Sequence, residues 1–175
     1  MAEGHFADRL CAAVARTGSP VVVGLDPRLE LLPEALLAAS RREFGATPQA
    51  VGEAFWRFSQ AIIDAVHDVA PAVKPQMAFY ERYGLAGLRA FAQTVCYARQ
   101  KGLLVIADAK CNDIGSTAEA YADAFLGTPS IFGQTAPSDF AADALTVNGY
   151  LGSDGIRPFV QQVEQHGRGI FVLVK

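Results

Sequence analysis

Residues 103–117 read LLVIADAKCNDIGST, an apolar run that leads directly into charged side chains. The first four residues, 103–106, are bulky and apolar, which is typical of a strand that is covered on both faces. Because side chains alternate along a strand, Asp108 and Lys110 are expected to point to the same side, with Asp113 one short turn later. The stretch therefore predicts a strand that ends in three charged groups.

A helix is expected directly after this charged turn. Ser116 and Glu119 have the Ser-x-x-Glu spacing of a capping box, which predicts a helix that starts at Thr117. A buried strand, a charged turn and a capped helix, in this order, are typical of a catalytic loop in an α/β protein.

The three charged residues also have a simpler interpretation, as a solvated cluster of ion pairs at a strand end. A solvated cluster has no need of four bulky apolar residues that lead straight into it. A lysine on the same face as an aspartate is also the arrangement that tunes a general acid. We therefore favour a catalytic role for Asp108, Lys110 and Asp113.

The composition indicates a single folded domain over residues 1–175, since 51% of the residues are hydrophobic and 19% are charged. A net charge of −3, without a run of Lys or Arg, gives no electrostatic basis for binding nucleic acid. No segment approaches the ~20 apolar residues that cross a bilayer, and residues 1–10 lack the pattern of a signal peptide. We expect a cytoplasmic protein that does not bind a membrane.

The cysteines give no sign of a disulfide framework or a metal site. Cys11, Cys96 and Cys111 are odd in number, widely spaced and without a CxxC motif or a neighbouring His. We expect no bound metal. Only Cys111 lies near the charged turn.

Two further strands are predicted to end in polar residues. Residues 21–25 are apolar and lead to Asp26, which either belongs to the site or caps the next turn. Residues 72–78 read AVKPQMA and carry Lys74. A lysine in an apolar strand is costly unless it is paired, so we expect Lys74 to point at Asp108.

Helical and strand patterns alternate along the chain. Helices are expected over residues 6–16, 47–69, 85–99, 117–126 and 153–165, the last capped by Ser153 or Asp154, and strands over 21–25, 72–78, 103–106, 144–147 and 169–174, with a loop at 130–140. This order indicates a parallel α/β sheet or barrel with its site at the carboxyl ends of the strands. A (β/α)8 TIM barrel usually needs ~250 residues, so about five β/α units indicate a partial barrel.

Segments in a fixed order resemble orotidine 5'-monophosphate decarboxylases, in particular the longer bacterial subgroup. Residues 108–117, DAKCNDIGST, resemble the family motif DxKxxDI-G-[ST]. The supporting segments are GLDPR at 24–28, VKPQ at 73–76 with FYE at 79–81, and TVNGYLG at 146–152. The likeness covers nearly the whole chain from Phe6 and implies the N-terminal part of a TIM-barrel decarboxylase.

The resemblance implies a cofactor-free enzyme that removes the C6 carboxylate of orotidine 5'-monophosphate and yields UMP in de novo pyrimidine biosynthesis. By motif position, Lys110 would protonate C6, and Asp108 would lie beside the departing carboxylate. Lys74 and Asp113 would complete an alternating chain of charges. A small nucleotide is thus the implied partner.

The resemblance also assigns substrate-binding residues and implies a homodimer. Asp26 would hold the ribose, Thr117 would help to bind it, and Asn148 in the matched segment 146–152 would contact the substrate. The family's equivalents of Asp113 and Thr117 reach into the neighbouring subunit's site, so the full-length protein is expected to be a homodimer. The family's phosphate-binding loops follow later strands than the five predicted here.

Two positions depart from the subgroup's pattern. Cys111-Asn112 stands where Arg-Gly is usual, and Gly149 replaces the usual Pro after Asn148. Because Asn adopts positive φ less readily than Gly, the charged turn is expected to differ in geometry.

Two alternatives remain open from the sequence. In a metal-assisted aldolase or sugar-phosphate decarboxylase of the same superfamily, Asp26, Asp108 and Asp113 would hold Mg²⁺, or Lys110 would form a Schiff base. In the other alternative, the chain is an inactive partial chain that keeps the fold elements without a working site. The GLDPR and VKPQ segments favour the orotidine monophosphate reaction.

Overall fold

The computed structural model describes residues 4–174, in which helices and strands alternate. In chain order the elements are α1 (Phe6–Thr17), β1 (Val22–Leu25), η1 (Leu29–Leu31), α2 (Glu34–Phe44), α3 (Pro48–Val66), β2 (Ala72–Pro75), α4 (Met77–Glu81), α5 (Gly84–Gln100), β3 (Leu104–Cys111), α6 (Gly115–Phe125), β4 (Ser130–Ile131), β5 (Gln134–Thr135), β6 (Ala144–Asn148), α7 (Ser153–His166) and β7 (Gly169–Leu173). Within these residues, no helix combines the length and the apolar composition that crossing a bilayer requires.

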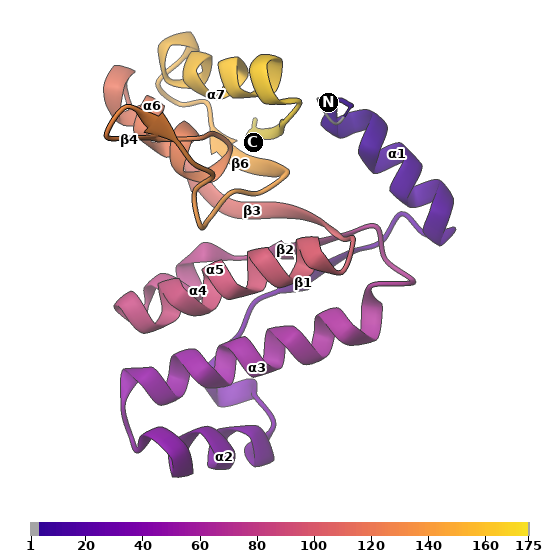
Figure 1. Ribbon diagram of the computed structural model, residues 1–175, viewed down its shortest axis with the longest axis vertical. Coiled ribbons are helices and arrows are strands. Elements are labelled where there is room, and N and C mark those ends of the chain that lie inside the picture. Colours follow the sequence, from indigo (N-terminus) through magenta and orange to yellow (C-terminus); the bar gives the residue numbers. More distant parts are fainter. Residues whose placement is uncertain (1–3, 175) are drawn as a thin grey trace.

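Five strands form one parallel sheet in the order β1-β2-β3-β6-β7. Helices connect the successive strands of this sheet (Figure 1). The arrangement confirms the predicted partial barrel of about five β/α units. Residues 130–140 were expected to form a plain loop, but they contain the antiparallel β4–β5 ribbon.

Side-chain alternation divides the sheet into two faces. The outer face carries the main apolar core, in which residues such as Val73, Val105 and Leu145 pack with side chains of α3, α5, α6 and α7. The inner face carries a smaller apolar cluster near the amino ends of the strands. This cluster consists of Phe6, Ala72, Ile106 and Ala144. The rest of the inner face is therefore free to carry polar groups.

Helix α1 covers the amino ends of the strands. The ring of Phe6 meets that of Phe171 in β7 edge to face, with centroids 6.0 Å apart. Arg9 Nη1 donates to Asp143 Oδ1 at 2.6 Å, directly before β6. Because Asp143 Oδ2 also accepts the backbone N–H of Val105 at 2.9 Å, α1 is tied to both β3 and β6.

The helix after the charged turn begins earlier than predicted. Helix α6 starts at Gly115, and Ile114 occupies the N-cap position without a side-chain cap. Gly115 adopts φ 40°, which lets the chain pass from the extended Ile114 directly into the helix. Ser116 thus lies inside the first turn, so the predicted capping box with Glu119 and the predicted start at Thr117 are wrong.

Two other boundaries also differ from expectation. Strand β2 ends at Pro75 rather than at residue 78, because the short helix α4 begins at Met77. Helix α7 has Gly152 at its N-cap, with φ 82°, so Ser153 and Asp154 lie within the helix and do not cap it. At α7 a glycine with positive φ begins the helix where a side-chain cap was expected, whereas at α4 the side chain of Gln76 caps the helix by accepting the backbone N–H of Ala78.

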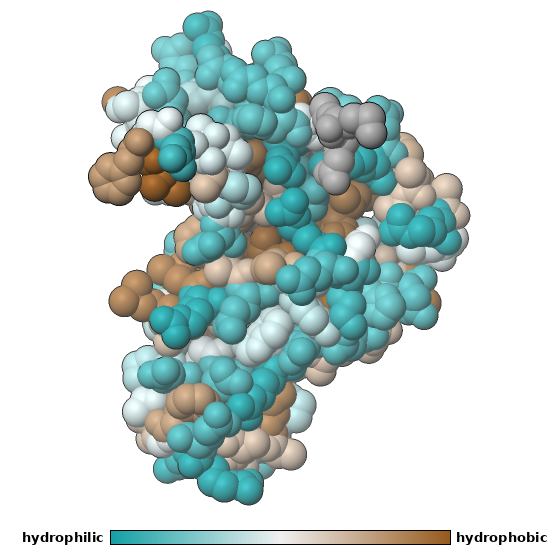
Figure 2. All heavy atoms as spheres, in the orientation of Figure 1, coloured by the Kyte–Doolittle hydropathy of each residue, from teal (hydrophilic) through white to brown (hydrophobic). Residues whose placement is uncertain are grey.

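Both edge strands of the sheet expose apolar side chains, namely Val21 and Val22 at β1 and Phe171, Val172 and Leu173 in β7. Within residues 4–174, β1 and β7 each pair with a neighbour on one side only. Each edge therefore presents unpaired backbone N–H and C=O groups to another chain. Figure 2 also shows hydrophobic atoms in the hollow between the α6–α7 part and the α3–α5 part.

The open edges predict that a polypeptide of these 175 residues self-associates. Val172 is 41% exposed on the edge strand β7, and the change Val172→Lys places a charge there. Because an edge charge opposes strand pairing between copies, the variant should contain a larger fraction of monomer than the parent chain. Size-exclusion chromatography with light scattering, at several protein concentrations, measures this fraction.

Leu85→Lys is the matched control, because Leu85 is 85% exposed but lies on helix α5 rather than on a strand. A parent chain that is monomeric at all concentrations, or an equal effect of both changes, would contradict association through the sheet edge.

Candidate active site

The inner face of the sheet brings the candidate site together at the carboxyl ends of its strands. Lys74 in β2, Asp108 in β3 and Thr146 in β6 each lie two residues after a member of the inner apolar cluster. Alternation therefore turns all three side chains to the same face. The prediction that Lys74 lies close to Asp108 is confirmed, since their charged atoms are 2.7 Å apart.

Asp108 is the centre of this site and is only 5% exposed. Its Oδ1 accepts hydrogen bonds from Lys110 Nζ at 2.5 Å and from Thr146 Oγ1 at 2.8 Å. Its Oδ2 accepts hydrogen bonds from Lys74 Nζ at 2.7 Å and from Gln76 Nε2 at 2.9 Å. Each carboxylate oxygen thus receives one ammonium group and one neutral donor.

These contacts keep Asp108 ionised. Burial raises the pKa of Asp108, but hydrogen bonds from Lys110, Lys74 and Thr146 outweigh the effect of burial and hold that pKa below its ordinary value of 3.8. The side chain of Lys110 is 46% exposed, whereas that of Asp108 is enclosed. The ammonium group of Lys110 is therefore partly open to solvent, whereas its counter-charge is enclosed.

Strand β3 extends further than the predicted 103–106 and contains the charged residues near its end. Its pairing with β6 is irregular between Ala107 and Cys111. Lys110 has φ 51°, a left-handed conformation that is uncommon for a residue other than glycine. Asp108 and Lys110 do meet, as predicted, but they meet across a bulge rather than through regular alternation.

Cys111 faces the main core and does not join the charged cluster. Burial raises the pKa of its thiol to about 12, so the group is protonated and unreactive. Among residues 4–174, no group of three or more His, Cys, Asp or Glu side chains is arranged to hold a metal ion. The described residues form a charge network rather than a set of metal ligands.

Asp26 and Asn148 lie at the same end of the sheet as the charged cluster. Asp26 is exposed and follows β1, whose last residue, Leu25, pairs with Pro75 of β2. Asn148 ends β6, and its Oδ1 accepts the backbone N–H of Tyr150 at 2.9 Å. Asp26 therefore follows the strand beside β2, and Asn148 ends the strand beside β3.

Asp113 and Thr117 lie beyond the end of β3. Asp113 Oδ1 accepts the backbone N–H of Ile114 at 2.8 Å, a contact within its own turn. Thr117 is exposed in the first turn of α6. Of the seven site residues predicted from the sequence, the structure joins Lys74, Asp108 and Lys110 through direct contacts.

Sequence reasoning did not single out Gln76 and Thr146 as site residues. Both continue the alternation of the inner face, and that periodicity is the signal by which they could have been found. The amide of Gln76 is oriented by its Oε1, which accepts the backbone N–H of Ala78 at 3.4 Å. This contact leaves Nε2 facing Asp108.

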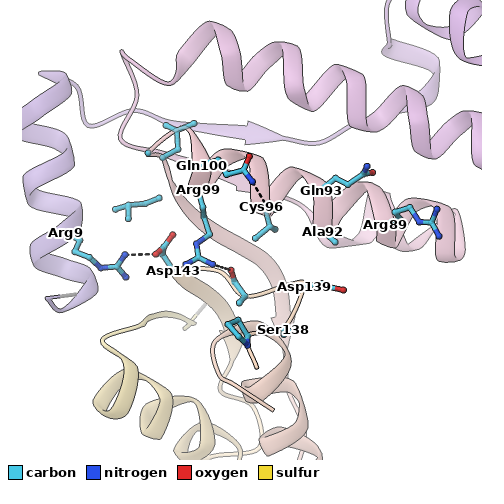
Figure 3. A pocket seen from close by; sticks show the side chains of 16 residues that line it. Arg9, Arg89, Ala92, Gln93, Cys96, Arg99, Gln100, Ser138, Asp139 and Asp143 are labelled. Atoms are coloured by element: carbon cyan, nitrogen blue, oxygen red, sulfur yellow. Dashed lines mark hydrogen bonds and ion pairs between the residues drawn. The ribbon is translucent and has the colours of Figure 1, made fainter. Parts of the chain in front are cut away.

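A cavity of about 960 Å³ lies at the amino ends of β3 and β6 (Figure 3). None of the residues that line it belongs to the charged cluster. Arg9 from α1 and Arg89 and Arg99 from α5 line it. Arg9 is bound to Asp143, and Arg99 Nη1 donates to the carbonyl oxygen of Ala141 at 3.3 Å. Two of its three arginines thus hold elements of the fold together.

Removing one ammonium group from Asp108 should change how stability depends on pH. Lys74→Met is expected to raise the pKa of Asp108, because Oδ2 loses its charged donor. A lowered folded-state pKa stabilises the fold fully above the unfolded pKa of about 4, and this contribution is lost as the pH falls through the folded pKa. The difference in unfolding free energy between parent and variant should therefore shrink below about pH 4.

Denaturant unfolding across this pH range, with ¹³C NMR titration of the Asp108 carboxyl group, measures both effects. Lys101→Met is the matched control, because it removes a lysine from an exposed pair with Asp64, at 2.6 Å, and leaves Asp108 intact. An unchanged Asp108 pKa in Lys74→Met would show that the electrostatic account of the cluster is wrong.

Comparison with known proteins identifies the family. Residues 19–175 match the model of the family described as orotidine 5'-phosphate decarboxylase / HUMPS. The chain is 47% identical over 173 residues to the orotidine 5'-phosphate decarboxylase of Rhodopirellula baltica. This alignment covers 97% of this chain and 54% of that protein. The chain is 36% identical over 171 residues to the orotidine 5'-phosphate decarboxylase of Caldicellulosiruptor saccharolyticus, with 98% and 56% covered.

A solved structure agrees with these sequence matches. The OMP decarboxylase of Leishmania donovani superposes with a TM-score of 0.71 at 29% identity, over 98% of this chain and 54% of that one. The chain thus spans about half the length of the relatives that it matches. Because the family model covers nearly all of the sequence, the chain belongs to the orotidine 5'-phosphate decarboxylase / HUMPS family.

Proposed function

We propose that this chain supplies the catalytic charge network of an orotidine 5'-monophosphate decarboxylase, which converts its substrate to UMP and CO2. The observation that carries the proposal is the arrangement at Asp108, which holds Lys110 on one carboxylate oxygen and Lys74 on the other. The relatives named as orotidine 5'-phosphate decarboxylases support the choice of substrate.

The chemistry of this reaction calls for fixed charges. When the bond between C6 and the carboxylate breaks, CO2 leaves and an electron pair stays on C6 without a conjugated acceptor. Charges that are already in place stabilise such an anion, because they need no reorganisation during the reaction. The partly exposed ammonium group of Lys110 in front of the buried Asp108 fits this need.

We assign the proton transfer to Lys110. Its Nζ–H bond breaks, the proton moves to C6, and the electron pair on C6 forms the new C–H bond of UMP, which leaves a neutral amine. Asp108 directs Lys110 Nζ and, as an anion beside the substrate carboxylate, favours its departure. Lys74 compensates the charge on the other oxygen of Asp108.

The remaining predicted residues are assigned to the nucleotide and to a second subunit. Asp26, after β1, and Asn148, at the end of β6, lie at the same end of the sheet as the cluster and would bind the substrate. Asp113 and Thr117 would complete the neighbouring subunit's site in a homodimer. This last assignment rests on the family resemblance, and the exposed surface beside Asp113, where Ile114 is 65% exposed, is accessible to a second chain. The proposed enzyme is cytoplasmic and needs no cofactor.

The contacts of Asp108 and Lys110 oppose the rival chemistries. A Mg²⁺ ion held by Asp108 would have to displace, or lie beside, two ammonium groups that already bind its oxygens. A Schiff base needs a neutral amine at Lys110, whereas this amine is an ammonium group paired with a carboxylate.

The test joins these 175 residues to the remaining half of the Rhodopirellula baltica relative, and we refer to the product as the joined chain. The joined chain is expected to decarboxylate orotidine monophosphate. Lys110→Ala should lower kcat by more than about 100-fold, because it removes the proton donor. The affinity for UMP should change by less than about threefold, because ribose and phosphate contacts provide most of it. Loss of substrate absorbance and calorimetric titration with UMP measure the two quantities.

Lys101→Ala is the matched control, since it removes an exposed lysine that pairs with Asp64 far from the cluster. Equal losses of turnover and UMP affinity in Lys110→Ala would make Lys110 a binding residue instead of the proton donor. The 175 residues alone are expected to be inactive. The family's phosphate-binding loops follow later strands, and the contacts of such loops with the substrate contribute binding energy to the reaction. A joined chain that folds but does not decarboxylate the substrate would contradict the proposed function.

A further inference from the structure

Thr146 occupies a special position opposite the bulge in β3. Ala107 pairs with Leu145, and Cys111 pairs with Val147. Three residues of β3, 108–110, therefore face a single residue of β6, which is Thr146. Both catalytic residues proposed above, Asp108 and Lys110, lie inside this bulge.

The hydroxyl group of Thr146 binds both of these residues. Its Oγ1 donates to Asp108 Oδ1 at 2.8 Å and accepts the backbone N–H of Lys110 at 3.0 Å. Thr146 is 9% exposed, so water has little access to replace either contact. One hydroxyl group thus joins the side chain at one end of the bulge to the backbone at the other end.

The backbone contact addresses a specific problem of the bulge. Lys110 has φ 51°, a conformation that persists only where the surrounding structure holds it in place. A bulge also removes regular ladder partners from backbone groups, and an unpaired, partly buried N–H is unfavourable. By accepting the N–H of Lys110, Thr146 supplies the missing partner and fixes the direction of the Lys110 side chain.

We infer that Thr146 is a positioning residue for the decarboxylation, which holds Lys110 and Asp108 in their reactive arrangement through its hydroxyl group. The inference rests on the proposed function. Thr146 acts through the two charged residues and needs no contact with the substrate.

The contact with Asp108 matters most when the proton has moved. Once Lys110 has given its proton to C6, the amine is neutral and its ion pair with Asp108 is lost. Thr146 Oγ1 and Gln76 Nε2 are neutral donors, so their hydrogen bonds to the two oxygens of Asp108 do not depend on that proton. They keep the carboxylate in place through the reaction.

The test compares three variants of the joined chain. Thr146→Val keeps the shape and removes the hydroxyl group, and it should lower kcat by about 10- to 100-fold, the value of one hydrogen bond to a charged group. KM for orotidine monophosphate should stay within about twofold, since ribose and phosphate contacts are intact. The acid limb of the kcat–pH profile should move to higher pH, because Asp108 loses a hydrogen bond that favours its ionised form.

Two further variants separate positioning from mere stability. Thr146→Ser restores the hydroxyl group and should recover most of kcat. Thr94→Val removes another buried hydroxyl group, which donates to the Ala90 carbonyl oxygen at 2.7 Å within α5, and should leave kcat and its pH profile unchanged. Thr146→Val with parental kcat, a shared effect of Thr146→Val and Thr94→Val, or no recovery in Thr146→Ser would overturn the inference.

A measurement that does not need activity distinguishes this inference from the proposed function. In Thr146→Val, the backbone amide of Lys110 should exchange with solvent faster, and the NMR-detected pKa of Asp108 should rise. If the parental joined chain is inactive, the proposed function fails, and these two signals still decide whether Thr146 holds the bulge. If both signals match those of the parent, the positioning role is wrong whatever the activity.

Discussion

The buried carboxylate of Asp108 is the constraint on which the rest of the site depends. A charge that is removed from water is tolerated only if every oxygen finds donors, and an incomplete set leaves a large penalty. Asp108 meets this condition with two ammonium groups and two neutral donors from β2, β3 and β6. The relative placement of these three strands is therefore tied to the ionisation of one side chain.

The two faces of the sheet divide stability and chemistry between them. The outer face is filled by the apolar core under α3, α5, α6 and α7. The inner face is apolar only near α1 and becomes charged toward the carboxyl ends of the strands. Charged groups can thus be placed for a reaction without interrupting the packing that keeps the sheet folded.

The sequence predicted those features that follow from a single strand and from the free-energy cost of burying an unpaired charge in it. Lys74 lies in an apolar strand and needs a counter-charge, and Asp108 lies at the equivalent end of the next strand. The bulge was not predictable, because periodicity within β3 does not reveal that three of its residues face Thr146 alone. The role of Thr146 depends on pairing between strands, which is not a local property of either segment.

Two local features of the sequence favour different first residues for α6. The capping-box spacing of Ser116 and Glu119 favoured a later start, but the backbone freedom of Gly115 provides an earlier entry. For Asp113 and Thr117, the roles taken from the family resemblance involve a second chain. The single chain explains only the contact of Asp113 with its own turn.

The residues that surround Asp108 lie within a short part of the chain, from Lys74 to Thr146. This has a consequence for biosynthesis on the ribosome. All the residues that β2, β3 and β6 contribute to the cluster leave the exit tunnel before any segment after Thr146. Every donor to Asp108 in the structure is thus synthesised before α7 and β7, so these later elements supply none of the contacts that hold its charge.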